Sequence, residues 1–92
     1  LKGFYIPNAF TPDNDQLNDT FKPYIGREIK NFQFTVYNRW GQTVFSTNNM
    51  DTAWDGTFKG ATQNTGVFMW ICTYQADGNE KKVEKGTVLL IR

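Results

Sequence analysis

The stretch IKNFQFTVYNRWGQTVFST, residues 29–47, decides the fold. Its first half alternates apolar with polar side chains, as a strand with one buried face does. The apolar positions are Phe32, Phe34 and Val36. Asn38 and Gly41 suit the first and fourth positions of a type I turn, because Asn caps its own backbone and Gly accepts the positive φ that closes the bend. The stretch therefore predicts a β-hairpin.

The rest of the chain reads as short strands separated by turns. Residues 4–10 alternate as well, but Pro7 lacks an amide donor, so we expect this strand at a sheet edge. Residues 67–72 are apolar without interruption, which predicts a central strand covered on both sides. Residues 77–79, Asp-Gly-Asn, predict a hairpin turn before the last strand. About seven strands and no helical period predict an all-β, antiparallel, immunoglobulin-like sandwich, with a small closed barrel as the alternative.

Composition limits the classes of function. The 92 residues suffice for one small domain, and because they open on Leu1 we expect a domain excised from a longer protein. There are 10 basic and 9 acidic side chains and no long basic run interleaved with aromatic residues, so nucleic acid is not an expected partner. No apolar run approaches the ~20 residues of a membrane span, so we expect no insertion into a membrane.

The residue types also argue against an enzyme. Histidine is absent and Cys72 is the only cysteine, which removes the usual zinc frameworks, a Cys-His dyad and an internal disulfide. We expect Cys72 to be a small core residue. Asp55 has no second carboxylate near it in sequence, so we interpret it as a turn residue rather than a general acid. No catalytic residue is predicted.

Two of the predicted turns contain tryptophan. Arg39 and Trp40 stand at the tip of the first hairpin, where turn geometry does not require them, and an aromatic ring beside a cation is a common recognition surface. Trp54 precedes a second turn, Asp55-Gly56. A turn tryptophan can instead fold back and plug the open end of a sandwich, so exposed and buried positions both stay open for Trp40 and Trp54. Trp70, in the most apolar strand, is expected in the core.

The first long loop is rich in carboxylates. Asp13, Asp15 and Asp19 place oxygen ligands at spaced positions, as calcium loops do, although no glycine marks a sharp turn and no glutamate completes the set. The alternative is an Asx-rich turn whose side chains cap their own backbone. Calcium is the one cofactor that this pattern indicates.

Five segments together resemble a known family, the gliding-motility-associated C-terminal domain, which is the type B sorting domain of the Bacteroidota type IX secretion system. The segments are IPNAFTPDNDQLNDTF (6–21), VYNRWGQTVF (36–45), WDG (54–56), TGVF (65–68) and KGTVLLIR (85–92). They occur in order from about residue 5 to residue 92. At 13–16 the chain reads Asp-Asn-Asp-Gln where the family usually has Asn-Gly-Asp-Gly.

The resemblance implies a C-terminal sorting signal that directs a large cargo protein through the periplasm to the cell surface or the medium. The partner it implies is the type IX secretion machinery, in particular an outer-membrane protein of the PorP/SprF family. We infer that exposed turns and the last strand contact this machinery. The inferred partner-binding residues are Arg39, Trp40, Gly41, Trp54, Asp55, Gly86 and Arg92. A carbohydrate-binding or adhesive sandwich, which the tryptophans and the Asp-rich loop would suit, is the alternative function.

Overall fold

A computed structural model of the chain describes residues 3–13, 19–76, 78 and 80–92. All regular elements of this part are strands, in the order β1 (Phe4–Tyr5), β2 (Ala9–Phe10), β3 (Tyr24–Ile25), β4 (Lys30–Tyr37), β5 (Thr43–Thr47), β6 (Thr57–Phe58), β7 (Ala61–Thr62), β8 (Gly66–Ala76) and β9 (Glu80–Leu90). The all-β prediction is confirmed. The described residues form no helix that is long and apolar enough to span a membrane.

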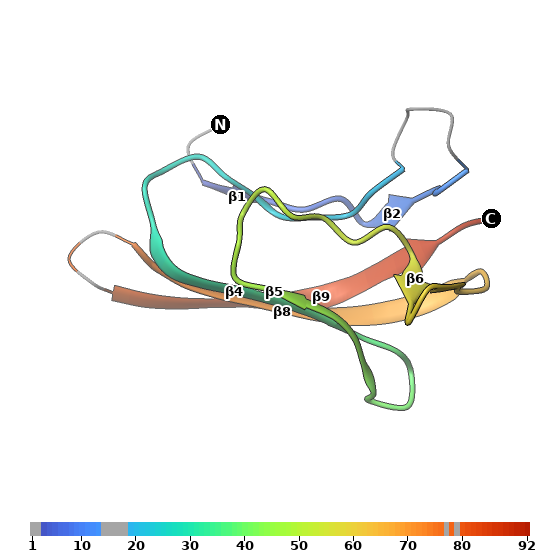
Figure 1. The fold of residues 1–92 in the computed structure, drawn as a ribbon. Coiled ribbons are helices and arrows are strands. Elements are labelled where there is room, and N and C mark those ends of the chain that lie inside the picture. The colour runs from blue at the N-terminus through green and yellow to red at the C-terminus, as the bar shows by residue number, and fades with distance from the viewer. Residues whose placement is uncertain (1–2, 14–18, 77, 79) are drawn as a thin grey trace.

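Five strands form the main sheet, in the order β2-β9-β8-β4-β5 (Figure 1). The predicted hairpin is β4 and β5, which pair antiparallel, and β8 and β9 form a second, longer hairpin. Of the hairpin turn expected at 77–79, positions 77 and 79 lie outside the described residues. One pairing departs from the antiparallel prediction: β2 lies parallel to β9, with Ala9 opposite Leu89 and Phe10 opposite Leu90. A strand near the start of the chain and the last strand thus run side by side in the same direction. Turn residues indicate only pairings between neighbouring strands, so they could not predict this one.

A thinner second layer covers one face of this sheet. It consists of the β1–β3 pair, a bridge between Phe21 and Trp54, and the loops that join them, while β6 and β7 form a small separate hairpin (Figure 1). The two layers are the predicted immunoglobulin-like sandwich. It has more strands than the seven expected, because residues 4–10 divide into β1 and β2 around Pro7 and several pairings last only two residues.

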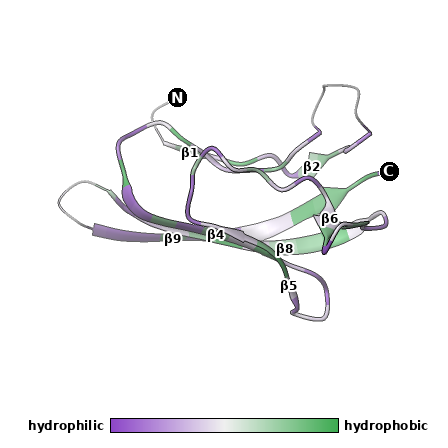
Figure 2. Ribbon diagram, viewed as in Figure 1, coloured by the Kyte–Doolittle hydropathy of each residue, from purple (hydrophilic) through white to green (hydrophobic). Residues whose placement is uncertain are grey.

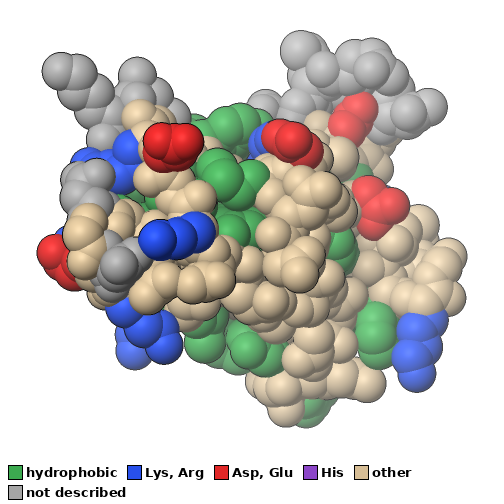
Figure 3. All heavy atoms as spheres, turned by 60° about the vertical axis from the view of Figure 1, so that its left-hand side comes forward, with side chains coloured by type: hydrophobic (Ala, Val, Ile, Leu, Met, Phe, Trp, Pro, Cys, Tyr) green, Lys and Arg blue, Asp and Glu red, His purple; other side chains and the backbone are tan. Residues whose placement is uncertain are grey.

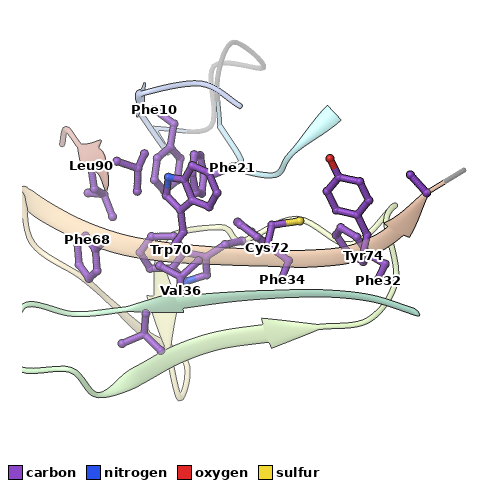
Figure 4. Close-up of a cluster of buried hydrophobic side chains, with 14 residues drawn as sticks. Phe10, Phe21, Phe32, Phe34, Val36, Phe68, Trp70, Cys72, Tyr74 and Leu90 are labelled. Atoms are coloured by element: carbon purple, nitrogen blue, oxygen red, sulfur yellow. The ribbon is translucent and has the colours of Figure 1, made fainter. Parts of the chain in front are cut away.

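Aromatic side chains fill the space between the layers (Figure 4). The buried apolar residues are Phe10, Phe21, Phe32, Phe34, Val36, Val44, Trp54, Phe68, Trp70, Cys72, Tyr74, Ala76, Val88 and Leu90. The alternation predicted for residues 32–36 and the core positions of Cys72 and Trp70 are therefore confirmed. We call the face of the main sheet that contacts this core the inner face, and the opposite face the outer face.

The prediction that residues 67–72 are covered on both sides is wrong. β8 is central, between β9 and β4, but its residues alternate between buried and exposed. On the outer face Val67 is 56% exposed, Met69 39% and Ile71 37%. The sheet has one covering layer only, so an apolar run with no polar alternation still leaves every second side chain in contact with solvent.

Candidate docking site

The hairpin tip at 38–41 is held by the side chain of Asn38, which is only 8% exposed. Its Oδ1 accepts hydrogen bonds from the backbone amides of Trp40 and Gln42, both at 3.0 Å, and its Nδ2 donates to Oε1 of Gln42 at 3.0 Å. The amide of Gly41 closes the turn on the carbonyl of Asn38 at 3.0 Å, with φ of 81° at Gly41. The predicted turn is confirmed, and hydrogen bonds to Asn38 hold the backbone amides of Trp40, Gly41 and Gln42.

The tip presents Trp40 and Arg39 to solvent. Trp40 is 77% exposed, and the guanidinium carbon of Arg39 lies 4.6 Å from the centroid of its ring, which is a cation–π arrangement. A bulge at Val36/Tyr37 interrupts the β4–β5 register just before the tip, and bulges bend a hairpin. In Figure 1 the tip projects below the main sheet, away from the covering layer. Of the two positions left open for Trp40, the exposed one is observed.

A shallow hollow of ≈ 150 Å³ separates the tip from the segment that enters β8. Asn38, Arg39 and Trp40 line one wall, and residues 63–68 line the other. The residues of the second wall include Gln63 and Asn64, which have amide side chains, Thr65, which has a hydroxyl, and the exposed Val67. The hollow therefore combines an indole and a guanidinium with neutral hydrogen-bonding groups.

The prediction that Trp54 is an exposed, partner-binding turn residue is wrong, because its side chain is buried. It is 1% exposed, its ring packs edge-on against Phe68 at 4.9 Å between centroids, and its Nε1 donates to the carbonyl of Thr57 at 2.8 Å. Of the two positions left open for Trp54, the buried one is therefore observed. The whole ring can be buried because its N–H donates to a backbone carbonyl. Asp55 beside it is exposed and accepts from the amide and the hydroxyl of Thr57, at 3.1 and 2.6 Å, which confirms its turn role.

Gly86 and Arg92 are occupied by contacts within the chain. Gly86 lies opposite Trp70, and a Cβ placed on it would stand 3.0 Å from Cζ2 of the indole. The Arg92 guanidinium donates to the carbonyls of Pro12 at 3.2 Å and Gly56 at 2.9 Å, and to that of Gln63. The close approach of Trp70 therefore explains why position 86 is glycine, and the hydrogen bonds to three carbonyls explain why position 92 is arginine. Arg92 ties together three loops at one end of the sandwich.

The seven inferred residues thus fall into four places, one of which is the core, where Trp54 lies. Arg39, Trp40 and Gly41 form the tip. Asp55 and Arg92 lie in the loop cluster, whose segment 63–66 also forms a wall of the hollow beside Trp40, since Thr65 accepts from the Arg92 amide at 2.9 Å. Gly86 is separate from both, in the middle of β9. Among these places, the tip alone combines exposure with an aromatic and a cationic group.

The acidic loop is described only in part, because Asp15 lies outside the described residues. Asp13 is exposed, while Asp19 is half-buried and shares a shallow hollow with Pro12, Thr20 and Asp55. Over the described ranges there is no group of three or more Asp, Glu, His or Cys side chains placed to hold a metal. The calcium prediction is left untested by this arrangement.

Sequence reasoning missed the outer face of the main sheet as a surface. Register places Val67 opposite Leu89, and Ile71 opposite Lys85, all on that face. Lys81 and Lys85 in β9 were the available signal, since residues four apart lie on the same face of a strand and lysine is rarely buried.

The only thiol of the chain, Cys72, is buried, and burial, with a smaller contribution from the Glu84 carboxylate, raises its pKa from 9.0 to about 12. A thiol that stays protonated in the core is inert. A small sandwich with an exposed aromatic side chain on an ordered turn is typical of protein modules that recognise a partner.

Comparison with known families names that module. The chain matches the CHU_C Type IX secretion signal domain over residues 4–90, nearly its whole length, and therefore belongs to this family. It is a C-terminal sorting signal for the type IX secretion system, and its cargo is a secreted protein. No curated protein matches the chain.

Proposed function

We propose that the hairpin tip, Arg39, Trp40 and Gly41, is the element of this sorting signal that the secretion machinery recognises. The observation that supports it is the 77% exposure of Trp40 on a turn whose backbone is hydrogen-bonded through a nearly buried Asn38. Tryptophan and arginine are the side chains that most often dominate binding energy at interfaces. Because the turn is already ordered, little conformational entropy is lost when a partner closes over it.

The partner in this proposal is an outer-membrane protein of the PorP/SprF family, which the domain meets during transit through the periplasm. The cargo then reaches the cell surface or the medium. The domain performs no reaction of its own: it offers a rigid surface and its only thiol is buried. Arg92 supports the wall opposite Trp40, because its backbone amide donates to the Thr65 hydroxyl and its guanidinium to the Gln63 carbonyl, while Asp55 is held in its own turn by Thr57.

The test is export of a reporter fused to residues 1–92 in a host with a type IX secretion system. The unaltered fusion should leave the cell, while Trp40→Ala and Arg39→Ala should leave the reporter in the periplasm. Tyr5→Ala is the matched control, because Tyr5 is also an exposed aromatic residue but lies in β1 of the covering layer. Normal export of Trp40→Ala would contradict the proposal.

A second candidate function rests on the hollow beside Trp40. An indole face next to amide and hydroxyl groups is a surface on which a sugar ring could stack and form hydrogen bonds. A glycan array, probed with and without calcium, tests this alternative. Trp40→Ala should abolish any true signal, and an array without binding removes the carbohydrate function while leaving the sorting function intact.

Calcium binding by Asp13, Asp15 and Asp19 also remains a proposal, supported by the spacing of the carboxylates. Isothermal titration with calcium and with magnesium tests it, with Asp15→Asn as the variant. A bound calcium ion should raise the melting temperature of the unaltered chain, because a ligand that binds only the folded state stabilises it.

A further inference from the structure

The outer face of the main sheet has a charge distribution unlike the rest of the molecule. The four long strands, β4, β5, β8 and β9, contain two acidic residues, Glu80 and Glu84. These stand opposite Ala76 and Cys72, which are buried, so both belong to the inner side of the sheet. On the outer side of β9, Lys81 and Lys85 are exposed. The outer face is therefore basic, with no carboxylate from any of these strands.

Apolar side chains gather toward the other end of the same face. Val67 of β8 lies opposite Leu89 of β9, which is 38% exposed, and Met69 and Ile71 follow along β8, opposite Thr87 and Lys85. Val83, which is 56% exposed, lies on this face between the two lysines. Figure 2 shows this grading along β8 and β9: the strands are hydrophilic toward their shared hairpin and hydrophobic toward the other end. In Figure 3, apolar and basic side chains reach the lower side of the molecule, where no acidic side chain is seen. Contiguous exposed apolar surface on a soluble domain marks an interaction site.

This face is continuous with the hairpin tip. Val67 lines the hollow that Trp40 and Arg39 line from the other side, and the tip projects toward the outer side of the sheet (Figure 1). A partner that closes over Trp40 therefore meets the apolar half of the outer face next. Lys85 follows, directly opposite Ile71, and Lys81 lies about 13 Å further along β9, from the rise of a strand.

We propose that the outer face is a docking surface for an acidic partner protein, with Val67, Met69, Ile71 and Leu89 covered by an apolar patch and Lys81 and Lys85 facing carboxylates. The proposal rests on the sorting function above and extends the docking surface beyond the tip. The complementary charge steers the encounter, and the apolar contact supplies most of the affinity.

Two other occupants fit less well. A second copy of this chain docked through the same face would bring lysines to a surface where the long strands provide no carboxylate. An anionic lipid surface usually takes up protruding apolar side chains, whereas Met69, Ile71 and Leu89 of this pleated sheet are little more than one-third exposed and Val67 and Val83 are 56% exposed. The surface of a partner protein can be complementary in shape to such partly exposed side chains.

Export of the fused reporter tests the proposal, with Lys81→Glu/Lys85→Glu as the main variant. We expect its export to fall about tenfold or more, the change that 1.4 kcal/mol makes in an affinity. Lys81→Arg/Lys85→Arg keeps the charge and should be exported normally. Lys59→Glu, in the β6–β7 turn outside the main sheet, is the control for reversing a surface charge elsewhere, with half the change in net charge, and should also be exported normally. Ile71→Thr, which changes no charge, should also reduce export.

Folding is checked by the circular dichroism melting curve of each purified variant, which should match that of the unaltered chain because these side chains lie on a solvent face. If the charge-reversed variant melts normally and is exported normally while Trp40→Ala is retained, the outer-face proposal is overturned and the tip proposal stands. If the charge-reversed variant is retained while Trp40→Ala is exported, the tip proposal fails alone. Equal losses for Lys59→Glu and the charge-reversed variant would overturn the outer-face proposal.

Two binding measurements address the other occupants. The purified domain should not sediment with phosphatidylglycerol vesicles, and it should be monomeric in analytical ultracentrifugation. Vesicle binding that Lys81→Glu/Lys85→Glu abolishes would replace the partner protein with a lipid surface. A dimer that the same variant dissociates would assign the face to a second copy. Either result overturns the proposal.

Discussion

The indole of Trp70 lies against Gly86 of the neighbouring strand, so closely that a Cβ on Gly86 would stand 3.0 Å from Cζ2 and 3.3 Å from Nε1. The ring cannot easily withdraw, because Phe4 stacks on it at 5.8 Å and Phe34 lies at 6.4 Å between centroids. Glycine in the middle of an eleven-residue strand is unfavourable by itself. Its presence here is explained by the space that the tryptophan needs.

Gly86→Ala should therefore destabilise the domain, by about 1 kcal/mol, because overpacking at a tight contact outweighs the smaller entropy of the unfolded chain. Urea unfolding measures the change. Gly66→Ala is the matched control: Gly66 is also a strand glycine, but its nearest neighbour would be the Asn64 carbonyl at 3.8 Å. Gly66→Ala should be neutral or slightly stabilising, and equal losses for both variants would refute the packing explanation.

Arg92 should contribute to stability through its bonds to three loop carbonyls. We expect Arg92→Lys to lower the free energy of unfolding by about 1–2 kcal/mol, since an ammonium cannot reach the carbonyls of Pro12, Gly56 and Gln63 in one geometry. Arg39→Lys, at the exposed tip, is the control and should change stability by less than about 0.5 kcal/mol. Thermal unfolding of both variants decides whether Arg92 is a structural residue.

Asn38 should determine whether the tip is ordered. Asn38→Ala removes two acceptor bonds and one donor bond of a nearly buried side chain, and we expect a loss of about 1–3 kcal/mol. Asn38→Asp keeps the acceptors for the amides of Trp40 and Gln42, so its loss should be smaller. If the two variants unfold at the same urea concentration, capping by the Asn38 oxygen is not what holds the turn.

Stability should fall at high pH through Cys72. Its pKa is raised to about 12 in the folded state from 9.0, so the folded chain holds the thiol proton more tightly than the unfolded chain. This contribution is complete below pH 9 and is lost as the pH rises from about 9 toward 12, by up to about 1.4 kcal/mol per pH unit. Burial also raises the pKa of Tyr74, which acts in the same direction above pH 10. Cys72→Ala should flatten the pH dependence of urea unfolding between pH 9 and 10, and an unchanged slope would contradict the assignment.

The hairpin at 29–47 was predictable because its signals are local. The buried side of β4 is indicated by the alternation of Phe32, Phe34 and Val36. The position where the chain reverses is indicated by Asn38 and Gly41. Both depend on residues a few positions apart. The burial preference of free cysteine placed Cys72 in the core, and the apolar run at 67–72 placed Trp70 there.

The candidate site was only partly predictable. Trp40 and Trp54 both occur beside turn residues, yet one is 77% and the other 1% exposed. The difference arises from what lies across the sandwich: Phe10, Phe68 and the Thr57 carbonyl receive the Trp54 ring, whereas the Trp40 turn extends past the end of the core. Likewise, Gly86 and Arg92 looked like surface residues of the last strand, because their partners Trp70 and Pro12 are distant in sequence.

The sequence by itself determined that this chain is an all-β sandwich, where its first hairpin turns, and to which family it belongs, since periodicity, turn chemistry and motif order are properties of neighbouring residues. Only the tertiary structure decided that β2 joins β9 in parallel, that Trp54 is core while Trp40 is surface, and that one face of β8 is open. These depend on which distant segments pack together. A single covering layer can bury only one face of a sheet, whatever the sequence of its central strand.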